Sequence, residues 1–198
     1  SLHHFKYGLY IFMSSVDVYS NTSEPSLNKE DSQIKIDKLT VYGFHKWIAE
    51  GLVRRYASEW LILRLGNLVG PGLKKNPVYD ALTAGLTWTS KESQYNLIHT
   101  RDMALALYRM VSESKTNEIL NVCGTGTVRM RDISKYADKD IMEAPGTDET
   151  SQNYNVNNDS LRNLISVSTS KQTLRDFVLE RGRESHRHRS DIDSEIRD

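Results

Sequence analysis

The sequence predicts an α/β protein built on a parallel sheet, with a smaller lobe beside it. Two runs consist mainly of consecutive apolar residues, as do strands that are covered on both faces of a parallel sheet. They are residues 9–15, which end in two hydroxyls, and residues 60–68. Between them, apolar side chains recur at helical spacing from Tyr42 to about Ser58. Strand, helix and strand in this order form the crossover unit of a parallel sheet, which is almost always right-handed.

The composition excludes several classes of function. Basic and acidic residues number 26 each, so the formal net charge is zero and the chain offers no long-range field that would attract nucleic acid. The apolar runs are far shorter than the ~20 residues that cross a bilayer, and we see no signal peptide. A single cysteine, Cys123, gives neither an internal disulfide nor a metal site. We therefore expect a cytoplasmic protein without a metal or a membrane contact.

The elements after the first strand follow from the same patterns. Residues 20–40 are polar and irregular, and loops of this length are usually functional or disordered. Beyond the second strand, Gly-Pro-Gly at 70–72 breaks the chain, and residues 95–99 are a strand candidate for the smaller lobe. Helical spacing returns at 102–114, before a third buried strand at 119–123.

The C-terminal part has weaker patterns. We expect short helices at 130–137, 159–165 and 174–179. Residues 180–198 are dense in charges of both signs and have little to bury. This tail should be solvated or disordered.

Tyr42 and Lys46 are the first candidates for chemistry. They lie four residues apart on the predicted helix, so their side chains share one face one turn apart. A phenol with an ordinary pKa near ~10 is a poor base, but a nearby ammonium favours the phenolate and makes acid/base work feasible. The same spacing is also common on surface helices that have no catalytic role.

Ser15 strengthens the catalytic interpretation. It ends a buried parallel strand, at the edge of an open α/β sheet where ligands bind. Its hydroxyl could bond a substrate oxygen that alternates between alcohol and carbonyl, while Tyr42 takes or returns the proton. Alternatively, Ser14 and Ser15 satisfy backbone groups at the strand end, which is the more usual role of such residues.

These residues carry a resemblance to a known family. Residues 12–19 (FMSSVDVY) resemble the strand of extended short-chain dehydrogenases, among them the NAD-dependent epimerases and dehydratases. Residues 42–46 (YGFHK) resemble the Tyr-x-x-x-Lys signature of that family, with Glu50 further along the helix. The segments 64–72, 98–104 and 120–124 are similar to its later elements in order and spacing.

The resemblance implies a cofactor and roles for named residues. NAD or NADP would accept hydride from a substrate carbon while Tyr42 removes the hydroxyl proton, and Lys46 would bind the nicotinamide ribose and lower the pKa of Tyr42. Ser15 would contact both cofactor and substrate. Further residues follow from the matched motifs: Gly66 would lie beside the nicotinamide, Asn67 would touch the substrate, and Tyr95 stands where sugar-nucleotide enzymes often carry a phosphate-binding arginine.

The largest departure from the family is that no Gly-x-x-Gly-x-x-Gly turn occurs in the sequence. Gly124-Thr125-Gly126 lacks the third glycine and reads as a turn after the last strand. The expected fold is therefore the C-terminal part of a Rossmann-like doubly wound parallel sheet with a small α/β substrate-binding lobe. Its segments would be the catalytic part of the sheet domain at 1–72, a substrate-lobe segment at 73–98, the last helix and strand of the sheet at 99–126, the C-terminal substrate lobe at 127–179, and the charged tail at 180–198.

The expected function is that of a truncated NAD(P)-dependent epimerase/dehydratase-type oxidoreductase acting on a nucleotide sugar or a related hydroxylated substrate. The family also implies a homodimer through the helix that bears Tyr42 and Lys46. Two alternatives remain open: a catalytically silent binding or assembly module, and a reductase of a small carbonyl compound.

Overall fold

The computed structural model of the protein describes residues 6–73, 75–137, 140–148 and 150–195. Its main sheet contains three parallel strands in the order β1-β2-β7, which are β1 (Tyr10–Ser15), β2 (Trp60–Leu65) and β7 (Glu118–Val122). Helix α1 (Val41–Tyr56) connects the first two strands, as the sequence predicts. The predicted α/β class is confirmed.

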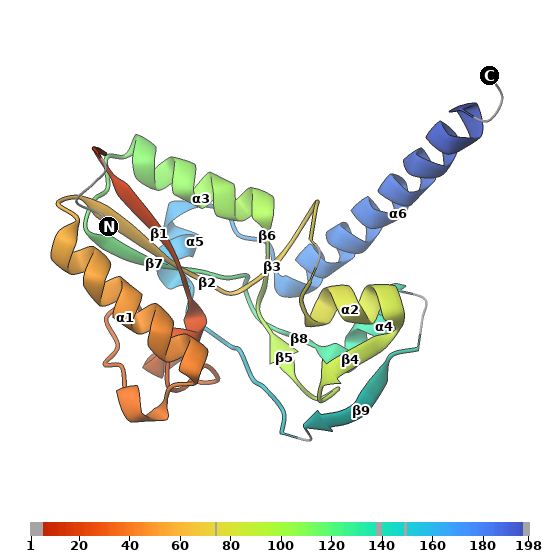
Figure 1. The fold of residues 1–198 in the computed structure, drawn as a ribbon, viewed down its shortest axis with the longest axis horizontal. Coiled ribbons are helices and arrows are strands. Elements are labelled where there is room, and N and C mark those ends of the chain that lie inside the picture. Colours follow the sequence, from red (N-terminus) through yellow and green to blue (C-terminus); the bar gives the residue numbers. More distant parts are fainter. Residues whose placement is uncertain (1–5, 74, 138–139, 149, 196–198) are drawn as a thin grey trace.

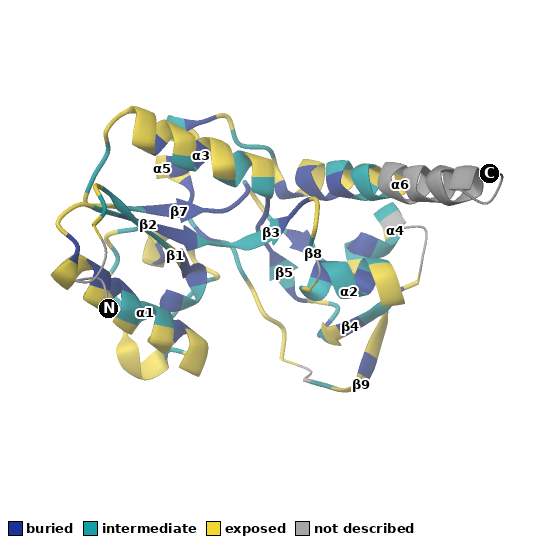
Figure 2. Ribbon diagram, turned by 45° about the horizontal axis from the view of Figure 1, so that its top comes forward, coloured by how far each residue is buried: buried dark blue, intermediate teal, exposed yellow. Residues whose placement is uncertain are grey.

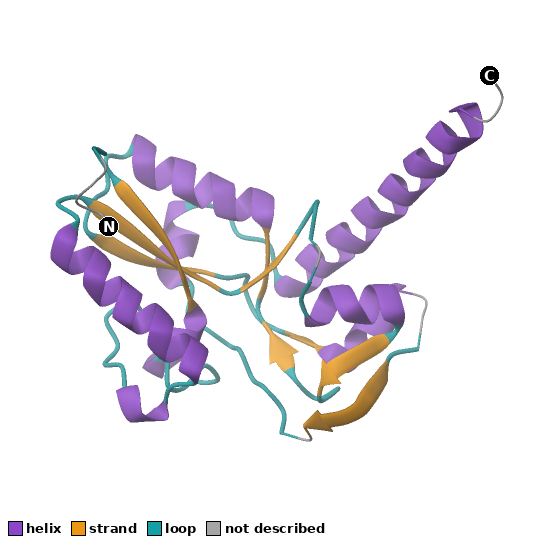
Figure 3. Ribbon diagram, viewed as in Figure 1, coloured by secondary structure: helices purple, strands orange, loops and turns teal. Residues whose placement is uncertain are grey.

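Helices cover both faces of this sheet (Figure 1 and, by element type, Figure 3). Helix α1 lies on one face, whereas α3 (Thr100–Ser112) and α5 (Asp159–Leu164) lie on the other. Strand β2 shows why apolar residues follow one another in its sequence from Trp60 to Leu63. Ile62 packs with α1, while Leu61 and Leu63 belong to the core under α3, and all three are fully buried.

The second strand is shorter than expected. Instead of one strand over 60–68, β2 ends at Leu65 and a new strand, β3 (Asn67–Val69), pairs with β6 (Leu97–His99) in a separate two-stranded sheet. Gly66 makes the change possible. Its N–H still bonds Val122 O at 2.9 Å, but a Cβ there would lie only 2.8 Å from the Cβ of Cys123.

The smaller lobe collects short elements around its own core. It contains α2 (Pro77–Ala84), β4 (Leu86–Thr89), β5 (Gln94–Tyr95), β8 (Val128–Arg129), a 3-10 turn (Met130–Ile133), α4 (Ser134–Ala137) and β9 (Met142–Asp148). Strands β4 and β9 pair in parallel, and β5 and β8 pair antiparallel. Figure 2 shows buried residues running from the main sheet into this lobe.

The structure defines two segments for which the sequence patterns were weak, the loop at 20–40 and the region around 174–179. The long loop contains 3-10 turns at Pro25–Leu27 and Ile36–Lys38, and is fixed by fully buried Asn28, which bonds the backbones of Asn21, Asn155 and Asn157. The expected helix at 174–179 is part of a longer one, α6 (Ser170–Glu195), which projects away from the body (Figure 1).

The charged tail at 180–198 was expected to be solvated or disordered. It continues α6 as far as Glu195, and residues 196–198 lie outside the described residues. The first turns of α6 are held by buried Leu174 and Phe177, and by Glu180, whose Oε2 lies 2.9 Å from Nε2 of His99. In the described ranges, none of the helices has both the length and the apolar composition needed to cross a membrane.

Candidate active site

The strand β1 and the helix α1 bring the predicted catalytic residues to one edge of the sheet. Ser15 is the last residue of β1, at the carboxyl edge, and a 3-10 turn (Val16–Val18) follows it. Tyr42 lies in the first turn of α1, which begins after Thr40; the Thr40 side chain accepts a hydrogen bond from Gly43 N at 3.1 Å. Lys46 follows one turn later.

Gly43 explains how closely the two elements meet. Its position is buried, and a Cβ there would overlap the backbone carbonyl oxygen of Asp17. Only a glycine allows the first turn of α1 to lie directly against the turn that follows Ser15. The glycine after Tyr42 therefore has a packing role in assembling this edge.

Lys46 lies between the strand and the phenol. Its Nζ donates a hydrogen bond to Met13 O at 2.8 Å and lies 5.8 Å from the centroid of the Tyr42 ring. It also lies 5.2 Å from the centroid of the Phe12 ring, within the ~6 Å range of a cation–π contact. The Tyr42 ring is 55% exposed, so the ammonium and the phenol are both open to a ligand.

The two serines have different partners. Ser15 is buried, and its Oγ donates to Asp17 Oδ2 at 2.7 Å while accepting from Asp17 N at 3.2 Å. Ser14 Oγ instead donates to Glu50 Oε1 at 2.6 Å. The alternative role, in which a serine satisfies the backbone at the strand end, is thus present for Ser15 alongside its contact with a carboxylate.

The remaining predicted residues lie further along the chain. Asn67 begins β3 and is half-buried, next to Gly66. Tyr95 is 2% exposed and lies inside the smaller lobe, where its hydroxyl is within hydrogen-bond distance of Thr89 Oγ1 and Gln152 Oε1, both at 3.1 Å. Burial raises the pKa of Tyr95. The predicted cofactor contact of Gly66 and substrate contacts of Asn67 and Tyr95 stay predictions.

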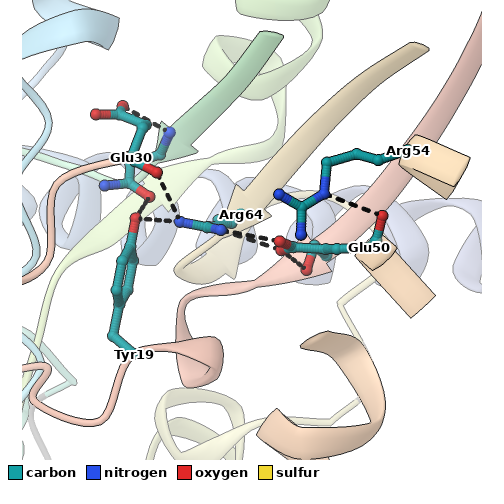
Figure 4. A network of polar contacts seen from close by, with 7 residues as sticks. Tyr19, Glu30, Glu50, Arg54 and Arg64 are labelled. Carbon is teal, nitrogen blue, oxygen red and sulfur yellow. Dashed lines mark hydrogen bonds and ion pairs between the residues drawn. The ribbon is translucent and has the colours of Figure 1, made fainter. Parts of the chain in front are cut away.

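A buried ionic network next to the site was missed in the sequence (Figure 4). Its centre is the pair of Glu50 and Arg64, which are 0% and 3% exposed by side chain, with Arg64 Nη2 2.9 Å from Glu50 Oε2 and Nε 3.0 Å from Oε1. Arg64 Nη1 also donates to the hydroxyl of Tyr19 at 2.8 Å and to Glu30 O at 3.2 Å. The Tyr19 hydroxyl in turn donates a hydrogen bond to Asn121 Oδ1 at 2.7 Å.

This network ties together the ends of all three main strands and helix α1. Burial raises the pKa of Tyr19 to about 12, although Arg64 opposes the shift. A signal for the network existed in the sequence. Arg64 stands within the apolar run of β2, and a guanidinium buried there requires a carboxylate partner.

The part of the chain that the structure describes contains no cluster of three or more histidine, cysteine or acidic residues able to hold a metal.

Comparison with known families identifies the family of the chain. A family model described as the NAD dependent epimerase/dehydratase family matches residues 2–123. The chain belongs to this family. No curated protein matches it.

Solved structures share the fold. MoeE5 in complex with UDP-glucuronic acid and NAD has a TM-score of 0.73 at 16% identity, covering 89% of this chain and 65% of its own. RMD from Pseudomonas aeruginosa complexed with NADPH has a TM-score of 0.68 at 20% identity, covering 87% and 66%. A UDP-galactose 4-epimerase has a TM-score of 0.68 at 19% identity, covering 89% and 64%. The chain thus spans slightly less than two thirds of the length of these proteins, and identities this low show the fold alone.

Proposed function

We propose that the protein is an NAD(P)-dependent oxidoreductase of the epimerase/dehydratase type, and that Ser15, Tyr42 and Lys46 carry its proton transfer. The observation that carries the proposal is the position of the Lys46 ammonium, 5.8 Å from the Tyr42 ring at the carboxyl edge of the sheet. Family membership supports the reaction class.

The residues present fit one end of the dinucleotide. Lys46 offers an ammonium with hydrogens beyond the one it donates to Met13 O, and the half-exposed Tyr42 ring lies beside it. These two residues would hold the nicotinamide ribose, and bound NAD or NADP would supply hydride transfer. A glycine-rich turn for the pyrophosphate does not occur among the 198 residues.

The chain's own groups account for the proton transfer. Tyr42 would move the proton of a substrate hydroxyl, because its phenol is half-exposed at the carboxyl edge of the sheet, where a ligand can reach it. Ser15 would bind the substrate beside that hydroxyl and orient it. The backbone contact of Lys46 with Met13 fixes the ammonium before any ligand arrives.

A nucleotide sugar is the proposed substrate class. Support comes from the names of similar structures, which include a UDP-galactose 4-epimerase and MoeE5 in complex with UDP-glucuronic acid. Asn67, at the start of β3, and Tyr95, in the smaller lobe, are the proposed substrate contacts. A small hydroxy-carbonyl compound is the alternative that a substrate panel would reveal.

A homodimer through α1 is part of the proposal. Large apolar side chains recur at four-residue intervals on the exposed side of this helix, and Figure 2 shows exposed residues along it. They are Phe44, Ile48, Leu52 and Tyr56, which are 37–51% exposed. A stripe of this kind on a surface helix is suited to a second copy.

The test is Tyr42→Phe in the natural protein, assayed with NAD and NADP against UDP-galactose, UDP-glucuronic acid and dTDP-glucose. Turnover should fall by about 10²- to 10⁴-fold, the contribution of a general acid/base, while Tm and cofactor Kd stay unchanged. Tyr108→Phe is the matched control, since Tyr108 is 67% exposed on α3, on the opposite face of the sheet. Near-normal turnover of Tyr42→Phe would sink the assignment, and a wild-type protein without turnover would favour a silent binding module.

A further inference from the structure

The carboxylate of Asp17 is held at both oxygens by residues far apart in the sequence. Oδ2 accepts the Ser15 hydroxyl at 2.7 Å, and Oδ1 accepts the Tyr154 hydroxyl at 2.6 Å. Capping of the 3-10 turn explains the bond from Asp17 N to Ser15 Oγ but not these two contacts. Asp17 therefore links the end of β1 to the C-terminal segment of the chain.

Tyr154 is itself fixed on rigid structure. Its backbone forms two hydrogen bonds with the β5–β6 segment, from Tyr154 N to Gln94 O at 2.8 Å and from Asn96 N to Tyr154 O at 3.0 Å. Its ring stacks on Tyr95, with centroids 5.7 Å apart and an interplanar angle of 18°. Burial, reinforced by the Asp17 carboxylate, raises the pKa of Tyr154, so its hydroxyl keeps the proton that it donates.

These contacts define which hydrogen bonds the Ser15 hydroxyl can still form. A hydroxyl has one proton and two acceptor sites, and an ionised carboxylate can only accept. The Ser15 proton therefore points to Asp17, and the bond from Asp17 N occupies one acceptor site. The Ser15 hydroxyl therefore has one acceptor site left for a ligand, and it has no proton left to donate.

We propose that Asp17 is a positioning residue for Ser15, oriented in turn by Tyr154, and that it makes Ser15 an acceptor for a hydroxyl group of the substrate. This inference rests on the proposed function, because it assigns Ser15 its direction of hydrogen bonding within that site. Ser15 would receive a hydrogen bond from a substrate hydroxyl next to the one whose proton Tyr42 takes, because each hydroxyl has a single proton to donate. Ser15 would not donate a hydrogen bond to a carbonyl.

A double-mutant cycle in turnover tests the proposal on the natural protein. Asp17→Asn should lower kcat by about 10- to 100-fold, the range for a lost hydrogen bond to a charged group, with cofactor Kd unchanged. Added to Ser15→Ala, it should lower kcat by no more than about twofold, because Asp17 acts only through Ser15. The proposal would be overturned if the kcat losses of the two single variants multiplied in the double variant, or if Asp17→Asn had full turnover.

Tyr154→Phe separates orientation from packing, since it keeps the ring stacked on Tyr95 and removes only the hydroxyl. We expect a loss of kcat of about 2- to 10-fold, the range for a neutral hydrogen bond. Tyr136→Phe, at another half-buried tyrosine packed on the core of the smaller lobe, should leave kcat unchanged. Equal losses in the two variants would mean that tyrosine hydroxyls matter only for packing, and would count against an orienting role.

Urea unfolding supplies a second readout that needs no ligand. The change in the unfolding equilibrium constant in the double variant should differ from the product of the changes in Ser15→Ala and Asp17→Asn. The difference should be at least about twofold, as for residues in direct contact. Multiplicative constants would show that no bond joins the two side chains and would overturn the inference. If the wild-type protein turns over no nucleotide sugar, the proposed function fails, while this cycle still decides whether Asp17 holds Ser15.

Discussion

Removing the Glu50 carboxylate should destabilise the protein strongly. Glu50 is fully buried and accepts three hydrogen bonds from side chains, one from Ser14 and two from Arg64. In Glu50→Leu the aliphatic volume is retained, but a guanidinium that is 3% exposed loses its counter-ion. Breaking a buried ion pair from one side costs about 3–5 kcal/mol, because the remaining charge stays desolvated.

Urea unfolding followed by circular dichroism measures this loss. With a slope of about 2.5 kcal/mol per molar urea, the unfolding midpoint should fall by about 1–2 M at unchanged slope. The double variant Glu50→Leu/Arg64→Met should be less destabilised than Glu50→Leu alone, since it leaves no uncompensated charge.

The matched control is Asp37→Asn, which removes one partner of an exposed ion pair. Asp37 and Lys38 are 3.8 Å apart, and their side chains are 76% and 68% exposed, so no measurable change in midpoint is expected. A midpoint for Glu50→Leu within experimental error of wild type would refute the view that this pair holds the strand ends together.

Three further predictions concern the site and its surroundings. Lys46→Met should lower both turnover and cofactor affinity in the natural protein, and an unchanged cofactor Kd would exclude the ribose contact. Gly43→Ala should lower the free energy of unfolding by about 1–3 kcal/mol, because the new Cβ meets Asp17 O; wild-type stability in thermal unfolding would show that the two turns are not in contact. The pKa of Tyr19 is raised to about 12 from 10.0, so the folded state keeps this proton where the unfolded chain loses it. Stability should therefore fall from about pH 10 to 12, less steeply in Tyr19→Phe, and an identical slope in that variant would contradict the shift.

Local patterns in the sequence predicted the main sheet well. The apolar run of β2 and the helical spacing of α1 are short-range signals, and burial on both faces or on one face produces them directly. The same signals failed where the chain leaves the sheet. Gly66 and Asn67 stand between apolar residues on both sides, and the apolar pattern alone continued the strand through them.

The strands of the smaller lobe show another limit. Strand β5 has two residues, and its pairing of Gln94 with Arg129 joins segments that are far apart in the sequence. Strand β9 contains Pro145 and Gly146, which argue against a strand locally, yet it pairs with β4. Such strands form because a partner strand pairs with them, and the local sequence pattern does not predict them.

The candidate site divides in the same way. Ser15, Tyr42 and Lys46 belong to one strand and the next helix, so spacing and order suffice to bring them together. Their supporting contacts do not. Tyr19 meets Asn121 across 102 residues and Asp17 meets Tyr154 across 137, and neither contact follows from any short pattern.

The long reach between Asp17 and Tyr154 also sets an order of assembly. During synthesis, the Ser15 turn and the helix with Tyr42 leave the ribosome well before Tyr154 exists, so the hydroxyl that orients Asp17 arrives last. A premature stop codon or a protease cut shortly before Tyr154 would leave every recognisable signature of the family in place. Such a shortened chain would still match its relatives by motif, yet its serine would have lost the group that aims it.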